Sequence, residues 1–471
     1  MAFKGWLTIV LIAGIAVLAV GVLRSLPGDN PAPIRDPDPN TAASPAEAIS
    51  DLAQMAAQIG ILSESQSEVT AEQRERLLRE EQVKVAQQLC KVLPKSADAA
   101  FLLAMAYQEQ GNSDAATVEL RRALQWQPTH VDALEQLGVI THTVGEFEKS
   151  LQTMRRVLEL DPQRLGIHLH IAEILAMQGQ LDLAVEALQQ ELALNPHSGK
   201  AHRVLGRTYL QKQSYEEAKA CLERAIAYEP QEPKAYYNLA TVCARLKLTG
   251  PAREYRQRFK ELEEMNQEAQ RQVRMTLDPL HVVVASVAHT HTDAGRLYAL
   301  AGQAGPTELL WKRAAQLDPN NLRCRLELAG LYQRAERPEQ ALEWCREVLV
   351  QDPNHGQVNY LIGTLQLASR RYDQAEAAFL KVIAVSPQRP EGYQALAGFF
   401  LVQKPDLPQA VSMAQQAVRL SSTAGNFALL AEAQWRSRNF AQAKAAAQQA
   451  LNRAPLDPRI QALHQKTMGN P

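Results

Sequence analysis

The most chemically suggestive cluster in the sequence is a group of three histidines and one aspartate. His281, His289, His291 and Asp293 fall within 13 residues, and imidazole and carboxylate groups are common ligands of divalent metals. Side chains two residues apart on a helix do not share a face, however, so a helical segment would separate His289 from His291. We therefore expect structural or surface roles for these histidines, with a metal or ligand site at 281–293 as the alternative.

No other stretch of the sequence carries a catalytic motif. The chain has no glycine-rich phosphate loop of the Gly-x-x-x-x-Gly-Lys type, no His-Glu-x-x-His zinc motif and no Gly-x-Ser-x-Gly nucleophile turn. These motifs position a phosphate, a metal ion and a serine nucleophile in three large classes of enzyme. We predict that the protein is not an enzyme, with no catalytic residue, no cofactor and no resident metal.

The charge balance argues against a nucleic-acid partner. The chain carries 50 basic and 51 acidic residues, for a net charge of −1. Proteins that bind nucleic acid usually carry an excess of positive charge, because most of their affinity comes from phosphate contacts.

Five cysteines are scattered along the chain, and none forms a Cys-x-x-Cys pair. We expect them to be small apolar core residues rather than a disulfide framework. Two pairs, Cys221 with Cys243 and Cys324 with Cys345, have spacings that could bring them close on neighbouring helices. Such bridges would form only in an oxidising compartment.

An uncharged apolar run lies near the start of the chain. The eighteen residues from Trp6 to Leu23 carry no charge and are flanked by Lys4 and Arg24, and this length is just sufficient to cross a bilayer as a helix. We expect residues 1–24 to be a membrane anchor, with a cleaved signal peptide as the alternative. The flanking charges favour a single-pass protein whose larger part lies on the extracytoplasmic, periplasmic side.

Residues 25–45 differ in composition from everything that follows them. They contain six prolines, which favour extended backbone and prevent a packed core. We interpret this segment as a linker that holds the rest of the chain away from the membrane.

Prolines at a fixed interval organise the remainder of the chain. Proline cannot continue a helix, so each one marks a position where a helix ends. A spacing kept this regularly indicates an internal repeat of 34 residues. The prolines on this spacing are Pro94, Pro128, Pro162, Pro196 and Pro230, and then Pro319, Pro353, Pro387 and, beyond Ser421, Pro455.

Each repeat unit has the same pattern of residue sizes. We number the places in a unit so that its proline falls at place 32; places 8, 20 and 27 are then usually small, and places 7, 11 and 24 usually large. Small residues let two antiparallel helices approach closely, and large ones fill the space beside them. Glycine at place 15 is a typical helix stop. In unit one, residues 97–130, these places hold Ala104, Ala116, Ala123, Leu103, Tyr107, Leu120 and Gly111.

This combination of repeat length, spacing and residue size resembles the tetratricopeptide-repeat family. The resemblance implies an all-α fold, a right-handed α-solenoid of antiparallel helix pairs. It also implies a protein that binds other proteins through the concave face of the solenoid.

The repeat is interrupted once. Unit five has Glu264 where its proline is expected, and about two steps plus 21 further residues separate Pro230 from Pro319. The interruption divides the repeats into two blocks of five units. The predicted segments are N-terminal helices or a degenerate repeat at 46–96, the first block at 97–266, an insert at 267–287, the second block at 288–457, and a C-terminal cap and tail at 458–471.

The resemblance also implies which residues face the groove. In this family, first-helix places near 2, 5, 9, 12 and 13 line the concave face. In the first three units these places are mostly acidic or apolar, whereas from unit four to unit seven they are rich in basic residues. We predict that this basic stretch, which crosses the interruption, binds the partner. The predicted groove residues are Lys200, Arg203, Arg207, Lys234, Tyr237, Arg245, His289, Arg296, Arg323 and Arg334.

The sequence thus favours a non-enzymatic scaffold that is tethered to a membrane of a bacterial envelope through residues 6–23. Its expected partners are acidic proteins or peptides that bind in the groove. The alternative is an accessory subunit of an enzyme or envelope-assembly system, with a metal or ligand site near residues 281–293.

Overall fold

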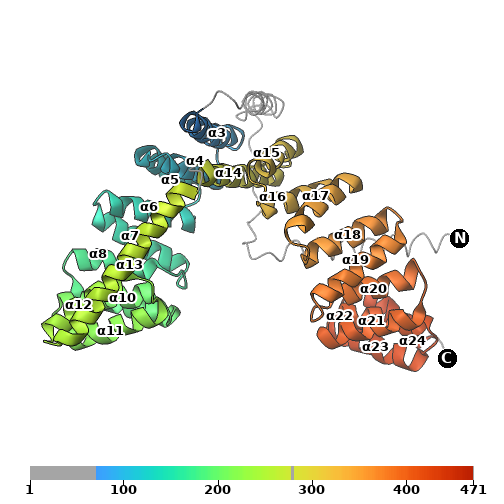
Figure 1. The fold of residues 1–471 in the computed structure, drawn as a ribbon. Helices are drawn as coiled ribbons and strands as arrows, with labels where there is room; N and C mark the ends of the chain where they lie inside the picture. Colours follow the sequence, from blue (N-terminus) through green and yellow to red (C-terminus); the bar gives the residue numbers. More distant parts are fainter. Residues whose placement is uncertain (1–69, 277–279, 470–471) are drawn as a thin grey trace. The chain divides into compact units, whose positions relative to one another are not determined.

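A computed structural model of the chain describes residues 70–276 and 280–469. Over these ranges the chain forms 22 helices and no strand, which confirms the predicted all-α architecture (Figure 1). The described residues divide into two compact units, 70–313 and 314–469, with the division inside one helix. These are called the first and the second unit, whereas unit one to unit ten are the 34-residue repeats.

None of the helices in the described ranges is long and apolar enough to cross a membrane. The predicted anchor at 6–23, the linker at 25–45 and the first part of the 46–96 segment lie outside those ranges.

The first unit contains the first five predicted repeats and one helix before them. Helices α4 to α13 form consecutive pairs, and each pair packs tightly together before the next begins. The helices are α3 (Ala71–Val92), α4 (Ala97–Glu109), α5 (Ser113–Trp126), α6 (Val131–Thr143), α7 (Phe147–Leu160), α8 (Ile167–Met177), α9 (Leu181–Leu194), α10 (Gly199–Gln211), α11 (Tyr215–Tyr228), α12 (Pro233–Arg245), α13 (Thr249–Thr276), α14 (Leu280–Leu300) and most of α15 (Ala304–Leu317).

The second unit repeats the same arrangement and ends on an additional helix, α24, which packs on α23 and α22. Its helices are α16 (Leu322–Arg334), α17 (Pro338–Gln351), α18 (Gly356–Ala368), α19 (Tyr372–Val385), α20 (Glu391–Val402), α21 (Leu407–Leu420), α22 (Ala424–Arg436), α23 (Phe440–Arg453) and α24 (Pro458–Met468).

Where glycine occupies place 8, it lies directly against the residue at place 24, as the size pattern predicts. A Cβ atom added to Gly363 would lie 2.3 Å from the ring of Phe379, and one added to Gly295 would lie 2.5 Å from the indole of Trp311. Cβ atoms do not approach other heavy atoms this closely, so glycine at place 8 makes room for the aromatic ring at place 24.

The turn at place 15 is left-handed in every unit except unit nine, whether or not glycine occupies it. Gly111, Gly145 and Gly179 have φ between 76° and 82°, a conformation that glycine adopts without strain. Later units place other residues there, and Lys247 and Arg438 still have φ near 60°. The repeat geometry therefore imposes this backbone conformation, at a cost of about 1 kcal/mol for a residue with a side chain.

The side chain at place 4 contacts the carbonyl oxygen of the proline at the end of the preceding unit. The side chains of His202 and Tyr236 each lie 3.1 Å from the carbonyl oxygen six residues before them, at Pro196 and Pro230. Both prolines lie in the turn that follows the preceding helix, α9 or α11. The contact gives the proline carbonyl a hydrogen-bond partner and connects consecutive units.

All five cysteines are buried and none is bridged. Burial is the main reason that the pKa values of Cys90 and Cys324 rise to about 11 and that of Cys345 to about 12. These thiols are therefore protonated at neutral pH, as is typical of small core residues.

Helices α13 and α14 include most of the predicted insert. Helix α13 continues to Thr276, about twice the length of the other second helices, and α14 begins at Leu280. Helix α14 then packs extensively on α3 and to a lesser degree on α4. This is how a first helix normally contacts the second helix of its own unit and the first helix of the next one, so α14 and α3 form a composite repeat from distant parts of the sequence.

A buried ionic cluster lies at the centre of the composite repeat. Glu81 of α3 is only 4% exposed, and its carboxylate is 2.9 Å from Nε2 of His291 and accepts two hydrogen bonds from Arg313, at 2.9 and 3.1 Å. Unit five ends without a proline, so His291 at place 4 has no proline carbonyl six residues before it and instead contacts Glu81.

Candidate partner-binding groove

The ten predicted groove residues lie in three separate regions of the structure. Lys200, Arg203 and Arg207 lie on α10, and Lys234, Tyr237 and Arg245 lie on the neighbouring helix α12. His289 and Arg296 lie on α14, beside α4, because α14 pairs with α3. Arg323 and Arg334 belong to the second compact unit. The residues of α10 and α12 are therefore the group that adjacent helices of one unit bring together.

Helix α10 presents two arginines four residues apart, on one face of the helix. Its N-terminus is capped by Ser198, whose hydroxyl accepts a hydrogen bond from the backbone N–H of Ala201 at 3.1 Å. The Arg203 side chain is 14% exposed, and its Nε lies 4.0 Å from the nearest carboxylate oxygen, on Glu232. The buried Nε atoms of Arg203 and Arg207 donate no hydrogen bond within the described protein.

The predicted groove residues of α12 are exposed to solvent. Lys234 and Arg245 are exposed. Tyr237 is 58% exposed, and its ring packs against Phe259 of α13 with 5.4 Å between the ring centroids. This surface offers positive charge beside an accessible aromatic ring.

Three acidic groove residues of units one and two are already paired within the chain. Arg164 lies 2.6 Å from Asp132 and 2.7 Å from Glu135. Asp98 lies 3.3 Å from His130. The neighbouring His130 imidazole is the main reason that the pKa of Asp98 falls below its ordinary value, in spite of burial. These pairs neutralise part of the negative charge at the acidic end of the groove.

The histidine cluster does not converge on one point. His291 is 2% exposed, and its Nδ1 lies 2.8 Å from the carbonyl oxygen of Val287. Both ring nitrogens of His291 therefore face protein acceptors, whereas His289 and His281 are exposed. Across residues 70–276 and 280–469, no group of three or more histidine, cysteine or acidic side chains is arranged to hold a metal.

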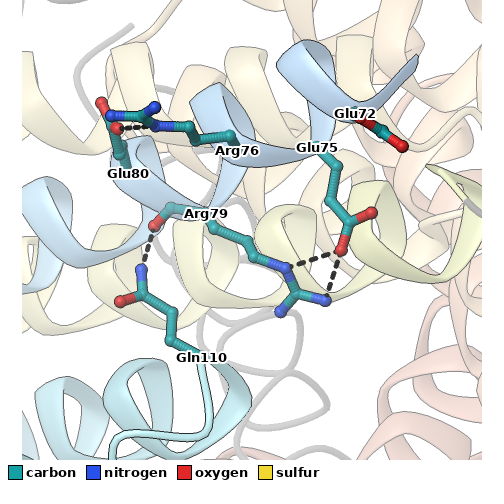
Figure 2. A pocket seen from close by; sticks show the side chains of 6 residues that line it. All are labelled: Glu72, Glu75, Arg76, Arg79, Glu80 and Gln110. Carbon is teal, nitrogen blue, oxygen red and sulfur yellow. Dashed lines mark hydrogen bonds and ion pairs between the residues drawn. The ribbon is translucent and has the colours of Figure 1, made fainter.

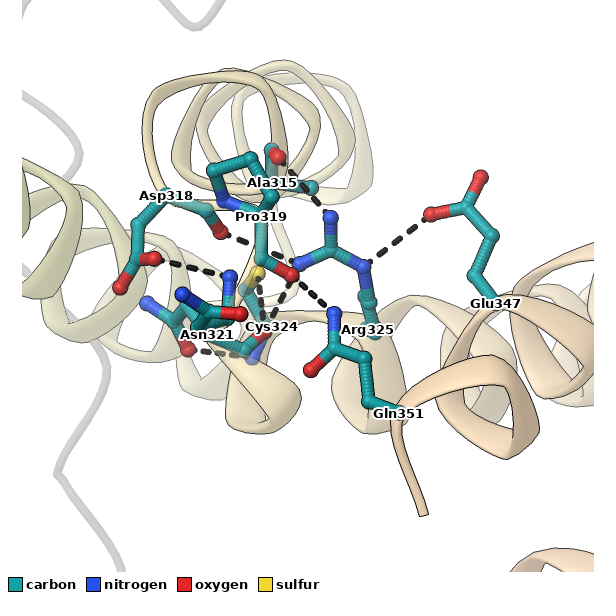
Figure 3. A network of polar contacts seen from close by, with 9 residues as sticks. Ala315, Asp318, Pro319, Asn321, Cys324, Arg325, Glu347 and Gln351 are labelled. Carbon is teal, nitrogen blue, oxygen red and sulfur yellow. Dashed lines mark hydrogen bonds and ion pairs between the residues drawn. The ribbon is translucent and has the colours of Figure 1, made fainter. Parts of the chain in front are cut away.

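One buried arginine of the second unit was not among the predicted sites and has a structural role. Arg325, at place 4 of unit seven, donates hydrogen bonds to the carbonyl oxygens of Ala315, Asp318 and Asn321 at 3.0 to 3.2 Å and pairs with Glu347 at 3.1 Å (Figure 3). Arg325 occupies place 4, where His202 and Tyr236 contact the carbonyl of the proline before them. This position in the repeat is the sequence signal for its role.

A hollow of about 380 Å³ on α3 does not qualify as a charged binding site. Arg79 pairs with Glu75 at 2.9 Å, Arg76 pairs with Glu80 at 3.0 Å, and Gln110 donates to the carbonyl oxygen of Arg79 at 2.8 Å (Figure 2). Both basic side chains therefore already have an acidic partner.

A second hollow, of about 240 Å³, lies in the second unit between the starts of α18 and α20. Burial, with a contribution from Glu391, raises the pKa of Tyr360 there to about 12. Its lining residues are Asp352, Asn354, His355, Gly356, Gln357, Tyr360, Val382, Ser386, Arg389 and Glu391. Two of them, Gln357 and Tyr360, occupy the groove places 2 and 5 of unit eight, so this hollow belongs to the groove of the second unit.

Comparison with family models identifies the repeats. Models described as tetratricopeptide repeats match residues 97–130, 143–199, and both 175–246 and 334–398. The chain is therefore an all-α solenoid that contains tetratricopeptide repeats, a class of protein that generally binds protein partners. No curated protein matches the sequence significantly.

Several solved structures are similar to parts of the chain at low identity. A MamA fragment from Desulfovibrio magneticus RS-1 is 19% identical with a TM-score of 0.33 and covers 36% of this chain and 96% of its own. The Pseudomonas aeruginosa protein PilF is 21% identical with a TM-score of 0.33, covering 50% and 97%. A repeat-containing protein from Cytophaga hutchinsonii is 17% identical with a TM-score of 0.36, covering 54% and 96%. Similarity at this level carries no argument about this chain.

Proposed function

We propose that the protein is a non-enzymatic scaffold whose groove, centred on Arg203 and Arg207 of α10, binds a carboxylate-bearing segment of a partner protein. The observation that carries this proposal is the state of these two arginines. Their Nε–H groups make no hydrogen bond within the described protein, and Arg203 approaches a carboxylate only at 4.0 Å, on Glu232, although Asp132 and Glu135 of unit two are both paired with Arg164. A guanidinium group can bind a carboxylate through two parallel hydrogen bonds, which makes it a suitable anchor.

The surroundings of the two arginines favour an acidic peptide over a single small anion. Lys200 and Lys234 are exposed near the starts of α10 and α12, and Tyr237 adds an accessible aromatic surface. Positive charge spread over two helices matches several carboxylates along a chain, and the tyrosine ring can pack against an apolar side chain between them. We do not extend the proposal to a metal or ligand site at 281–293, because His291 contacts Glu81 and His289 faces solvent.

Reversing the charge of both arginines should abolish partner binding without unfolding the repeats. Hydrogen bonds to charged groups are worth about 1.5–3 kcal/mol each, so Arg203→Glu with Arg207→Glu should reduce partner recovery by at least about tenfold. The measurement is quantitative co-purification of cross-linked partners from cells that express the full chain. The matched control is Arg121→Glu with Arg155→Glu, because both residues are exposed arginines of the same unit. Equal recovery by the groove variant and the wild type would contradict the proposal.

We also propose that residues 6–23 tether the scaffold to a membrane and that the repeats lie on the extracytoplasmic side. The support is the uncharged run of eighteen residues and the six prolines that follow it. The full chain should then remain in the membrane fraction after alkaline carbonate extraction, and replacing Ile12 and Val17 by aspartate should release it. Protease added to intact spheroplasts should digest the repeats. Extraction of the wild-type chain into the supernatant, or protection of the repeats, would refute the tether or the orientation, respectively.

A further inference from the structure

The second helix of unit five differs from those of units one to four at the places where the next repeat normally packs. In units one to four, place 24 is a fully buried apolar residue and place 28 is a half-buried one. In unit five, places 21, 24 and 28 are Arg253, Arg256 and Lys260, and all three are exposed. At places 24 and 28 the corresponding residues in units one to four are Leu120 and Leu124, Met154 and Leu158, Leu188 and Leu192, and Leu222 and Ile226; at place 21 they are Thr117, Leu151, Val185 and Lys219.

These three residues, the basic end face, lie on the side of α13 that a following first helix would cover in a regular stack. Helix α14, the next helix in the chain, instead packs on α3 and α4. Figure 1 shows α12 and the start of α13 at the end of the first unit's series of repeats that lies away from α3. The second unit ends differently, because α24 packs on α23 and Ala447 at place 24 is fully buried. The first unit therefore has an end face that remains accessible.

The basic end face carries charge that the described part of the chain does not neutralise. Arg253, Arg256 and Lys260 make no ion pair with any residue of 70–276 or 280–469. The ion pairs on α13 involve other residues, for example Arg258 with Glu261 at 3.1 Å. Polar residues of any kind would be sufficient to keep a terminal repeat soluble. Here, however, all three residues are basic, and their spacing of three and four places them along one face of the helix.

Acidic residues on the same helix do not cancel this positive charge. Glu254 and Glu264 are exposed, and neither pairs with a residue of the basic end face. Two more exposed cations lie before α13, Arg245 at the end of α12 and Lys247 in the turn that follows, also without an ion pair in the described chain. These basic side chains are therefore exposed to solvent, where they can attract an anionic partner.

We propose that the basic end face docks an acidic amphipathic helix of a partner protein, at the position that the first helix of a sixth stacked unit would occupy. The repeat geometry supports a helix as the occupant. The second helices of units one to four, α5, α7, α9 and α11, each pack against the first helix of the next unit. The charge supports glutamate or aspartate at the contact positions. The surface differs from the concave groove, so the proposal goes beyond the groove function and does not depend on it.

The test uses the full chain and a synthetic helical peptide of about five turns, with leucine on one face and glutamate at three- and four-residue spacing beside it. Fluorescence anisotropy of the labelled peptide should show saturable binding that weakens steeply as salt rises from about 50 to about 500 mM. The variant Arg253→Glu, Arg256→Glu, Lys260→Glu should reduce the affinity by at least about tenfold. It should instead bind a peptide in which lysine replaces every glutamate.

Two control variants locate the binding. Lys91→Glu, Arg121→Glu, Arg155→Glu makes the same change in net charge on exposed residues of the same unit, and should bind the acidic peptide as the wild type does. The groove variant Arg203→Glu, Arg207→Glu should also retain this binding. Loss in the groove variant alone would place the peptide in the groove and refute the end-face proposal while leaving the groove proposal intact.

Every other result overturns the proposal. Equal loss in the charge-matched control indicates non-specific attraction. Binding to phosphatidylglycerol vesicles or duplex DNA, but not to the acidic peptide, indicates another class of partner. No binding to any probe means that the basic end face only solvates the last repeat of the first unit.

Discussion

Replacing Glu81 by alanine is expected to cost about 3–5 kcal/mol of stability in the first unit and to release α14 from α3. The reason is that breaking one member of a buried ionic cluster leaves the others without compensation. Glu81 is 4% exposed and contacts His291 and Arg313 at 2.9 Å each. Without this carboxylate the buried imidazole and the largely buried guanidinium would have lost their shared acceptor.

The measurement is urea unfolding together with hydrogen–deuterium exchange of α3 and α14. The matched control is Glu80→Ala, because Glu80 is the neighbouring residue and its side chain is 41% exposed in a pair with Arg76. Exposed pairs within a helix contribute less than about 1 kcal/mol, so the control should unfold almost as the wild type does. Equal midpoints for the two variants, or unchanged exchange of α14 in Glu81→Ala, would show that the cluster does not hold the composite repeat together.

The same cluster predicts an acid-dependent stability. Burial by itself would raise the pKa of Glu81, but His291 and Arg313 outweigh it and lower the pKa from 4.5 to about 2. A carboxyl group whose pKa is lower in the folded state stabilises the fold above its unfolded-state pKa, and this contribution is lost as pH falls towards the folded-state value. The wild type should therefore lose stability more steeply than Glu81→Gln between about pH 4.5 and pH 2. Parallel curves over this range would contradict the assignment.

The change Gly363→Ala is expected to destabilise the second unit by about 1–3 kcal/mol, although alanine normally favours a helix more than glycine. The added Cβ would lie 2.3 Å from a ring carbon of Phe379, which is 1% exposed and also packs against Tyr360 at 5.8 Å between ring centroids. The ring cannot move without disturbing its neighbours, so the helix-propensity gain of about 1 kcal/mol is outweighed.

Gly330→Ala is the control for this experiment. Gly330 lies in the middle of α16, one place later in its unit, and an added Cβ there meets only the end of the Arg334 side chain at 3.3 Å. This flexible group can move aside, so the substitution should be neutral or stabilising by up to about 1 kcal/mol. Both variants can be compared by their thermal midpoints. Equal stabilisation by the two alanines would mean that place 8 has no close contact with place 24.

The repeat itself was predictable from sequence because its interactions join neighbours along the chain. The pairing of place 8 with place 24 links positions only 16 residues apart. It recurs along the chain as a constraint on residue size, except in unit five, where place 24 is the exposed Arg256. The left-handed turn at place 15 follows from the same local geometry and persists at Lys247 and Arg438 without glycine. Short-range constraints of this kind leave a periodic record in the sequence.

Part of the candidate site followed from the same periodicity. The places carried by α10 and α12 do lie on adjacent helices, because consecutive units stack. Periodicity alone could not show that Arg203 and Arg207 have buried Nε atoms without hydrogen bonds, whereas Asp132 and Glu135 are bound to Arg164. Those differences depend on which long side chains reach one another between units.

The tertiary structure alone decided where the chain goes after unit five. The sequence shows an interruption at Glu264, but only the fold shows that α14 packs on α3, about 200 residues earlier in the chain. This pairing separates His289 and Arg296 from the basic residues of α10 and buries His291 against Glu81. Arg256 and Lys260, at places that are apolar in units one to four, are the sequence signal that stacking ends at unit five. Which surface α14 then covers depends on a long-range match between two helix faces, and such a match leaves no period in the sequence.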